Sequence, residues 1–187
     1  MKNKKELIKR VLLAIFVSFV ATIIYSYRYA IYYKYLRLRT PKTSDPANNE
    51  IIAGLHPVFA YRIAKLVKSR EDQGHSIILT SGFRSWDQQE QLYNSGQTTA
   101  PAGSSLHNYG MAADLNEDGV LKMATPASTW RASGIVEEAE KLGLRWGGNF
   151  GNYDPVHFDF MEKYDINLLR GLYQNGQLVQ NKYVKIW

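Results

Sequence analysis

The chain has 187 residues, no cysteine and a formal net charge of +6. This length suits one domain of about 100–150 residues with an appendage. The lack of cysteine excludes disulfides, thiolate metal sites and a cysteine nucleophile, so a bound metal must use His, Asp or Glu. Residues 1–42 hold ten basic residues and one acidic residue, a net +9, whereas residues 43–187 hold 13 basic and 16 acidic residues, a net −3. Because the larger part is mildly acidic, we expect no nucleic-acid partner.

An uncharged apolar segment lies close to the N-terminus, at residues 11–27, and reads VLLAIFVSFVATIIYSY. Its length is at the lower end of the roughly 17–25 residues that span a bilayer. Basic residues precede it and tyrosines follow it, which is typical of a cytoplasmic flank and an interfacial aromatic belt. A cleaved signal peptide is the alternative, but bulky tyrosines and Arg28 stand where a small-residue cleavage site would lie. A buried core helix is disfavoured by the basic flanks.

We therefore expect four segments along the chain. They are a basic cytoplasmic tail over 1–10, a transmembrane anchor with its aromatic and basic flank over 11–35, a polar linker broken by prolines over 36–50, and a folded domain over 51–187. Residues 11–27 then hold the chain in the cytoplasmic membrane as a single span. Basic residues beyond the segment, such as Arg37, weaken the charge asymmetry that sets its orientation.

Apolar periodicity predicts a mixture of helices and strands in the domain. Amphipathic spacing indicates helices over 56–72, 87–93, 128–142 and 165–173. Short apolar runs indicate strands over 76–80, 111–115, 144–146 and 156–160, with a terminal extended piece over 183–187. Residues 96–105 are rich in Gly, Ala, Pro and Ser and are expected to form a loop. This order fits an α+β domain better than regular βαβ winding.

Two short clusters hold candidate metal ligands. His107 and Asp114 are separated by Gly110, which allows a bend between them, and Asp154 comes three residues before His157. A hydrolytic zinc site needs three protein ligands, an open position for water and a neighbouring acid/base. We predict a mononuclear Zn²⁺ site held by His107, Asp114 and His157. Taken alone, His107 is equally compatible with an ordinary surface loop residue, and an isolated Asp154/His157 pair is more typical of ordinary polar residues at a strand edge.

The carboxylate of Asp154 is the predicted acid/base. It lies just before the strand that carries His157, within reach of a metal-held water. Asp159 is the alternative, because side chains alternate along a strand and Asp159 shares a face with His157.

Arg84 directly follows a predicted strand, in the run Ser81-Gly82-Phe83-Arg84-Ser85. Its guanidinium could clamp a substrate carboxylate or stabilise an oxyanion, or it could form a surface salt bridge. Ser105 could hydrogen-bond the substrate or cap a turn. We expect no metal-site role for His56, at a helix start, or for His75, in a turn.

At these residues the chain resembles the VanY-like family of bacterial cell-wall peptidases. The family pattern is SGFRS followed by Q and L, then S-x-H-x-x-G-x-A-x-D, then an acidic residue three before a final His. The chain matches it from about Leu55 to Phe160, including Gln88 or Gln89 with Leu92. The family includes D-alanyl-D-alanine carboxypeptidases and L-alanyl-D-glutamate endopeptidases.

The resemblance implies a small antiparallel sheet flanked by helices, the fold shared with Hedgehog signalling domains. It implies Zn²⁺ held by His107, Asp114 and His157, catalysis by Asp154, and substrate contacts from Arg84, with Ser105 and Gln89 as further substrate-binding candidates. Peptidoglycan stem peptides are the implied substrate, so the domain is expected on the outer, periplasmic side of the membrane.

The form Asp-x-x-His-Phe, at Asp154 to Phe158, is more similar to the L-alanyl-D-glutamate branch than to the carboxypeptidase branch, which usually has Glu and then Trp before the final His. The alternatives are a D-alanyl-D-alanine carboxypeptidase and a non-catalytic zinc-containing module that binds wall peptides or a protein. A binder would need the three ligands but not Asp154.

Overall fold

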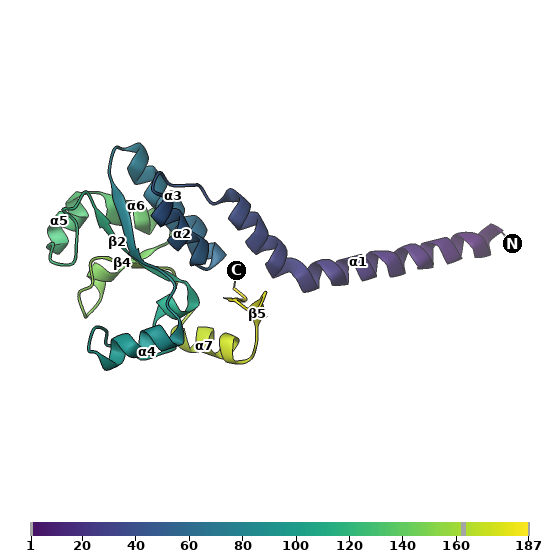
Figure 1. Cartoon of the computed structure of the whole chain (residues 1–187). Helices are drawn as coiled ribbons and strands as arrows, with labels where there is room; N and C mark the ends of the chain where they lie inside the picture. The colour runs from purple at the N-terminus through teal and green to yellow at the C-terminus, as the bar shows by residue number, and fades with distance from the viewer. Residues whose placement is uncertain (1, 162–163, 187) are drawn as a thin grey trace.

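The computed structural model describes residues 2–161 and 164–186, so Met1 and Trp187, the ends of the expected tail and terminal piece, lie outside the described residues. A long helix, α1 (Lys2–Arg39), extends away from a folded part that holds the other elements (Figure 1). The other helices are α2 (Pro46–Gly54), α3 (Pro57–Asp72), α4 (Trp86–Asn94), α5 (Ala127–Ala132), α6 (Ile135–Lys141) and α7 (Ile166–Gln174). The strands are β1 (Ile77–Ser81), β2 (Ala112–Glu117), β3 (Arg145–Trp146), β4 (His157–Asp159), β5 (Leu178–Val179) and β6 (Tyr183–Val184), with 3₁₀ turns η1 (Leu106–Tyr109) and η2 (Gly147–Asn149).

Four of the strands form one antiparallel sheet in the order β1-β2-β4-β3. Its register pairs Asp114 of β2 with His157 of β4 and with Ser81 of β1. Directly opposed residues on neighbouring strands have side chains within contact distance. The sheet therefore brings together two predicted site residues that are far apart in the sequence, and the expected α+β fold is confirmed.

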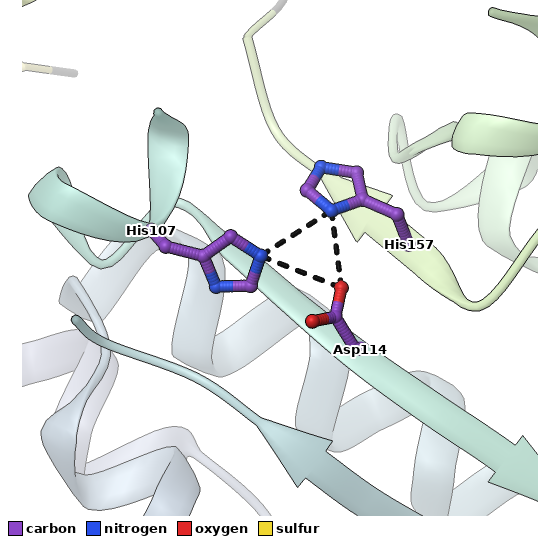
Figure 2. Close-up of side chains that lie close together, drawn as sticks. All are labelled: His107, Asp114 and His157. Atoms are coloured by element: carbon purple, nitrogen blue, oxygen red, sulfur yellow. Dashed lines mark hydrogen bonds and ion pairs between the residues drawn. The ribbon is translucent and has the colours of Figure 1, made fainter. Parts of the chain in front are cut away.

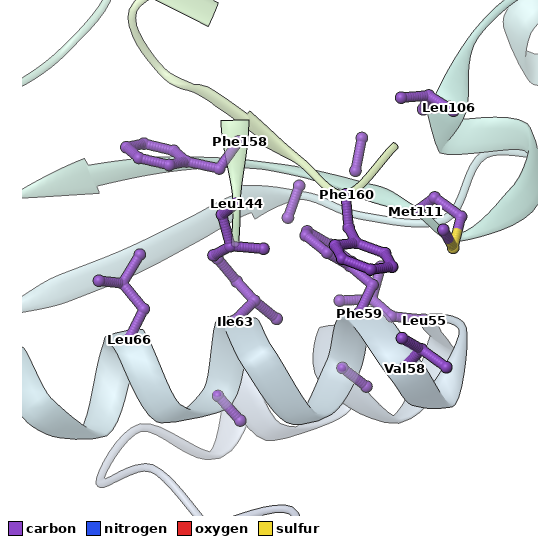
Figure 3. Close-up of a cluster of buried hydrophobic side chains, with 14 of the residues drawn as sticks. Leu55, Val58, Phe59, Ile63, Leu66, Leu106, Met111, Leu144, Phe158 and Phe160 are labelled. Atoms are coloured by element: carbon purple, nitrogen blue, oxygen red, sulfur yellow. The ribbon is translucent and has the colours of Figure 1, made fainter. Parts of the chain in front are cut away.

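The core lies between this sheet and α3 (Figure 3). Phe59 and Ile63 of α3 face Phe160 and Leu144, and all four side chains are buried. Full burial of such side chains stabilises a fold by about 1.5–3 kcal/mol each. The helix begins where the sequence predicts, because His56 accepts a hydrogen bond from the Val58 N–H at the helix N-cap and Pro57 occupies the first turn.

The long helix α1 has two different environments. One stretch, Lys4–Arg39, is long and apolar enough to cross a membrane. Within it, Thr22 Oγ1 donates to Ser18 O (2.9 Å) and Ser26 Oγ to Thr22 O (2.8 Å), a pattern that bends helices, and Figure 1 shows α1 bending before it reaches the folded part. The last turns pack on the domain, where Tyr33 and Leu36 are buried.

The segment over 36–50 differs from the expected linker. Its first residues complete α1, and its last residues begin α2, where Asp45 accepts from the Ala47 N–H and Pro46 stands in the first turn. The Asn48 side chain donates to Ile77 O and accepts from Leu79 N, both at 2.8 Å, so it pairs with the edge of β1. Proline here starts a helix rather than breaking one, because its missing N–H costs nothing at that position.

The helix expected over 128–142 is divided in two. Gly134 has φ +87° between α5 and α6, a left-handed conformation that ends the first helix.

Candidate metal centre

The imidazole of His107 is fixed by its own short turn. Ser105 caps η1 by accepting a hydrogen bond from His107 N (3.3 Å), and Gly110 ends the turn at φ +65°. A Cβ on Gly110 would lie 2.7 Å from His56 N, so the turn also needs a glycine for its close approach to α3. His107 Nδ1 lies 2.6 Å from Gly82 O, which makes Nδ1 the protonated nitrogen and leaves the Nε2 lone pair facing the site.

Three side chains converge from η1, β2 and β4 (Figure 2). His107 Nε2 lies 3.3 Å from His157 Nδ1 and 3.4 Å from Asp114 Oδ1, and His157 Nδ1 lies 3.1 Å from the same Oδ1. Their ligand atoms all lie within 4.8 Å of one another. The residues that the sequence predicts as metal ligands thus form one cluster.

A second layer of contacts orients His157. Asp159 Oδ2 lies 3.4 Å from His157 Nε2, and Arg145 holds the Asp159 carboxylate through two hydrogen bonds of 2.7 Å. Asp159 is 1% exposed. A carboxylate behind a ligating imidazole fixes its tautomer and its orientation. Asp159, the alternative acid/base, lies behind His157 in this arrangement.

Arg84 contacts the carboxylate of Asp114. Its Nη2 donates to Asp114 Oδ2 at 2.7 Å and to Ser81 Oγ at 2.9 Å, so Oδ1 alone faces the two imidazoles. Gln89 is fully buried, donates to Ala100 O (2.8 Å) and lies 3.5 Å from Arg84 Nη1. The structure therefore places Gln89 behind Arg84, and Ser105 at the cap of η1.

Asp154 lies in the turn that precedes β4. Its N–H donates to Gly147 O (3.1 Å), and its own carbonyl accepts from His157 N (3.2 Å). A Cβ on Gly147 would lie 2.3 Å from Asp154 O and 2.9 Å from His157 Cβ, so only glycine fits beneath this turn. Asp154 Oδ1 is buried without a hydrogen-bond partner among the described residues. Burial raises the pKa of the Asp154 carboxyl, and the charge of Asp114 adds to this, against the opposing effect of His157.

The electrostatics of the cluster favour a positive charge between its members. Burial lowers the pKa of His157, but the hydrogen bonds that it donates to Asp114 and Asp159, together with their negative charges, outweigh burial and raise this pKa to about 9. Burial raises the pKa of Asp114, yet its hydrogen bonds with the two imidazoles hold that pKa well below its usual range. An ionised, buried carboxylate needs a cationic partner.

The donor set fits zinc. Two imidazole nitrogens and one carboxylate oxygen are a ligand combination that zinc accepts, and it leaves a fourth position for water. The unpartnered Asp154 Oδ1 is an acceptor that such a water would satisfy. His56 and His75 lie elsewhere, as expected: His56 Nε2 bonds to Val184 O, and His75 Nδ1 contacts Asp118.

Sequence analysis missed the residues that hold the loop before His107. Arg170 donates to Gly103 O and Ser104 Oγ, and the Tyr109 hydroxyl also donates to Gly103 O. Arg145 was missed as well. Period-two alternation on β3 and β4 could have indicated its pairing with Asp159, whereas nothing in the sequence relates Arg170 to a loop 66 residues earlier.

Comparisons with known proteins agree with this arrangement. The profile of a family described as D-alanyl-D-alanine carboxypeptidase matches residues 98–160, the segment that contains the whole His/Asp cluster and Asp154. The peptidoglycan L-alanyl-D-glutamate endopeptidase CwlK of Bacillus subtilis is 28% identical over 147 residues, covering 69% of this chain and 87% of the relative.

Among solved structures, the LdcB LD-carboxypeptidase matches with a TM-score of 0.50 at 18% identity, covering 71% of each chain, and shares the fold. The L-Ala D-Glu endopeptidase ChiX of Serratia marcescens matches with a TM-score of 0.48 at 21% identity, covering 62% of this chain and 86% of its own. The family match and the similarity to CwlK confirm the resemblance found in the motifs, which is to the VanY-like family of peptidoglycan peptidases.

Proposed function

We propose that the chain is a membrane-anchored zinc peptidase that hydrolyses the peptide stems of peptidoglycan as an L-alanyl-D-glutamate endopeptidase. The observation that carries the proposal is the convergence of His107, Asp114 and His157 beside the partly buried carboxylate of Asp154, whose Oδ1 has no hydrogen-bond partner among the described residues. Three ligands and a separate acid/base are the parts that metal-assisted amide hydrolysis needs.

In the proposed mechanism His107, Asp114 and His157 hold Zn²⁺, which when bound supplies Lewis acidity and lowers the pKa of a water at its open position. Asp154 accepts the proton of the attacking water and returns it to the leaving amine. The raised pKa of Asp154 suits this role, because a carboxyl that is less acidic binds the proton more firmly between the two transfers.

Arg84 keeps Asp114 in its orientation and can also reach the substrate. Its Nη2 is occupied by Asp114 and Ser81, while Nη1 makes only a long contact, 3.5 Å, to Gln89. We propose that the Nη1 face binds the substrate carboxylate or the oxyanion that forms at the attacked carbonyl. Gln89 and Ser105 support the site from behind, as positioning residues.

The endopeptidase assignment is supported by the motif Asp154-Pro155-Val156-His157-Phe158 and by the similarity to CwlK, whose name gives that activity. The second candidate is a D-alanyl-D-alanine carboxypeptidase, favoured by the description of the family that matches residues 98–160. The two activities cut different bonds and so leave different new termini.

Digestion of purified peptidoglycan by the full chain in detergent, with added zinc or with a chelator, separates these candidates. Endopeptidase cleavage leaves a free amino group on D-glutamate and a carboxyl group on L-alanine, whereas carboxypeptidase cleavage releases free D-alanine. Mass analysis of the fragments distinguishes them. Release of D-alanine alone would overturn the endopeptidase assignment, and products formed by Asp154→Asn at the native rate would overturn the proposed mechanism.

We also propose that α1 crosses the cytoplasmic membrane once, with the catalytic domain on the outer side, where peptidoglycan lies. The basic residues before residue 11 support this orientation. Protease added to intact spheroplasts should then remove the domain. Full protection, under conditions that digest a known periplasmic protein, would contradict this topology.

A further inference from the structure

A groove of about 640 Å³ lies where α1 meets the folded part, and none of the proposed metal ligands lines it. Its wall on α1 is apolar and includes Ile23, Ile24, Tyr27 and Ile31, and the facing wall includes Tyr183 of β6. The volume is within the range of about 300–1,000 Å³ that is common for small-ligand sites. The groove is large enough for a ligand of its own.

The position of the groove along α1 relates it to the membrane surface. Ile23, Ile24 and Tyr27 belong to the apolar segment that we propose spans the bilayer, whereas Lys34, at the other end of the groove, lies beyond it. A helix rises 1.5 Å per residue, so Ile24 and Lys34 lie about 15 Å apart along the axis. With the apolar segment ending at Tyr27, Ile24 lies about 4.5 Å inside the hydrocarbon and Lys34 about 10 Å beyond its edge. The groove therefore extends from the hydrocarbon of one leaflet to its headgroups.

The charge of the groove is positive at its headgroup end. Lys34 and Arg37 line this end, and none of the residues that line the groove is acidic. Arg37 is already bound to Ile52 O (3.0 Å) and to the Tyr183 hydroxyl (3.0 Å). Lys34 has no hydrogen bond or ion pair within the described part of the chain. One cationic side chain is thus free to bind an anion at the depth of lipid phosphates.

We propose that the groove binds an anionic phospholipid of the outer leaflet. An acyl chain lies along Ile23, Ile24, Tyr27 and Ile31, and the phosphate contacts the Lys34 ammonium. A lipid fits because the apolar wall continues directly into the proposed span, where lipid is the surrounding solvent. The proposal depends on that span and not on the peptidase activity.

Native mass spectrometry of the full chain, released from bilayers of equal phosphatidylglycerol and phosphatidylcholine, tests the site. We expect phosphatidylglycerol to be retained over phosphatidylcholine by about fivefold, the ratio that one cation gives at an anionic surface. Lys34→Glu should remove the preference. Arg39→Glu is the matched control, since it makes the same charge change on the same helix outside the groove, and it should keep the preference.

Equal retention of both lipids, or an equal loss in the two variants, would overturn the lipid site. Displacement of phosphatidylglycerol by excess soluble glycerol phosphate would also overturn it, because the apolar wall would then contribute nothing. Extraction of the chain from the bilayer by alkaline carbonate would instead overturn the membrane span, and with it this site. None of these outcomes depends on peptidoglycan hydrolysis, so the two proposals can fail separately.

Discussion

At the scale of single residues, each imidazole of the cluster is bonded on the side that faces away from the site. His107 bonds there to a backbone carbonyl, Gly82 O, and His157 to a carboxylate, Asp159. Both ligand nitrogens are therefore presented without any rearrangement of the rings. The motifs predicted which residues take part, but not these partners, because the partners are set by sheet register and by the fold of η1.

Replacing the carboxyl of Asp154 tests its role in proton transfer. Asp154→Asn should keep the fold and the metal, since this residue is not among the ligands, but lose at least about a hundredfold in turnover. Turnover on peptidoglycan, measured alongside zinc content per chain, checks this. Near-normal turnover would remove Asp154 from the mechanism, whereas loss of zinc would make it a ligand.

The three ligands themselves are tested by metal content. His107→Ala should lower bound zinc to well below one ion per chain, because it removes one of only three protein ligands. Elemental analysis of the purified variant checks this, with His75→Ala as the control imidazole outside the cluster. A full zinc ion in the His107 variant would show that the assignment is wrong.

Asp159 contacts the proposed ligand His157, so its replacement should weaken metal binding. For Asp159→Asn we expect zinc affinity to fall by about 10–100-fold, the usual effect of losing a carboxylate behind a ligating histidine. Competition with a chromogenic chelator measures the affinity. Asp118→Asn is the matched control, because Asp118 contacts His75 in the same way outside the cluster, and it should leave the affinity unchanged.

At the scale of elements, the periodicity of apolar residues predicts a helix or strand correctly where one face of that element is buried. It predicted α3, α4, β1 and β2 to within a few residues. Periodicity did not predict α2. The buried residue Asn48 on this helix is polar and pairs with β1, and a contact between distant segments leaves no pattern in the local sequence. Periodicity also joined α5 to α6, because the apolar spacing continues through Gly134, and only the backbone conformation of this glycine separates them.

The turn that carries Asp154 is sensitive to the size of residue 147. Gly147→Ala would push its Cβ into Asp154 O and displace the proposed acid/base from the proposed ligands, and a displacement of about 1 Å can cost about a hundredfold in rate. We expect a folded protein with strongly reduced turnover. Gly151→Ala, in the same loop with nothing within 4 Å of its Cβ, should retain normal turnover. Equal turnover of the two variants would show that residue 147 need not be glycine to keep Asp154 in position.

His56 should make stability depend on pH. Burial lowers its pKa to about 4, opposed by the hydrogen bond to Val184 O, whereas the unfolded value is near 6.5. Between these values the unfolded chain binds a proton that the folded chain does not, so stability present above pH 6.5 is lost as the pH falls to about 4. The difference amounts to about 3 kcal/mol.

Urea unfolding at pH 7.5 and pH 4.5 measures this loss. His56→Asn keeps a side chain that caps helices but does not titrate, so between these two pH values it should lose roughly 2–3 kcal/mol less than the native protein. Zinc release at low pH affects both proteins and cancels in the comparison. Equal losses would mean that His56 does not titrate in this range.

At the scale of the whole molecule, the end of α1 is part of the folded core. The Tyr33 hydroxyl donates to Val184 O (2.6 Å) and accepts from Ile186 N (2.8 Å), and Leu36 is buried beside it. The boundary expected near residue 50 therefore lies inside a packed unit. In the sequence, tyrosines that follow an apolar segment indicate a membrane interface. No local pattern shows that one of them, Tyr33, instead binds the strand β6.

Truncation at two points tests this packing. A fragment of residues 28–187 keeps Tyr33 and Leu36, whereas one of residues 43–187 loses both. At about 1.5–3 kcal/mol for each buried side chain, the shorter fragment should be less stable by about 3–6 kcal/mol, a large share of a typical domain's stability. Urea unfolding of both fragments gives the difference. Equal midpoints would show that the end of α1 contributes nothing to the domain.

The packing of Tyr33 against β6 also limits where the enzyme can work. Among the described residues no flexible linker separates the proposed span from the domain, so the His/Asp cluster is held at a fixed distance from the membrane surface. It can then move only in the plane of the membrane, by lateral diffusion of the helix. Its reachable substrate is then a thin layer of wall parallel to the membrane. Peptidoglycan farther out would be spared by distance alone, even where its peptide stems are chemically identical.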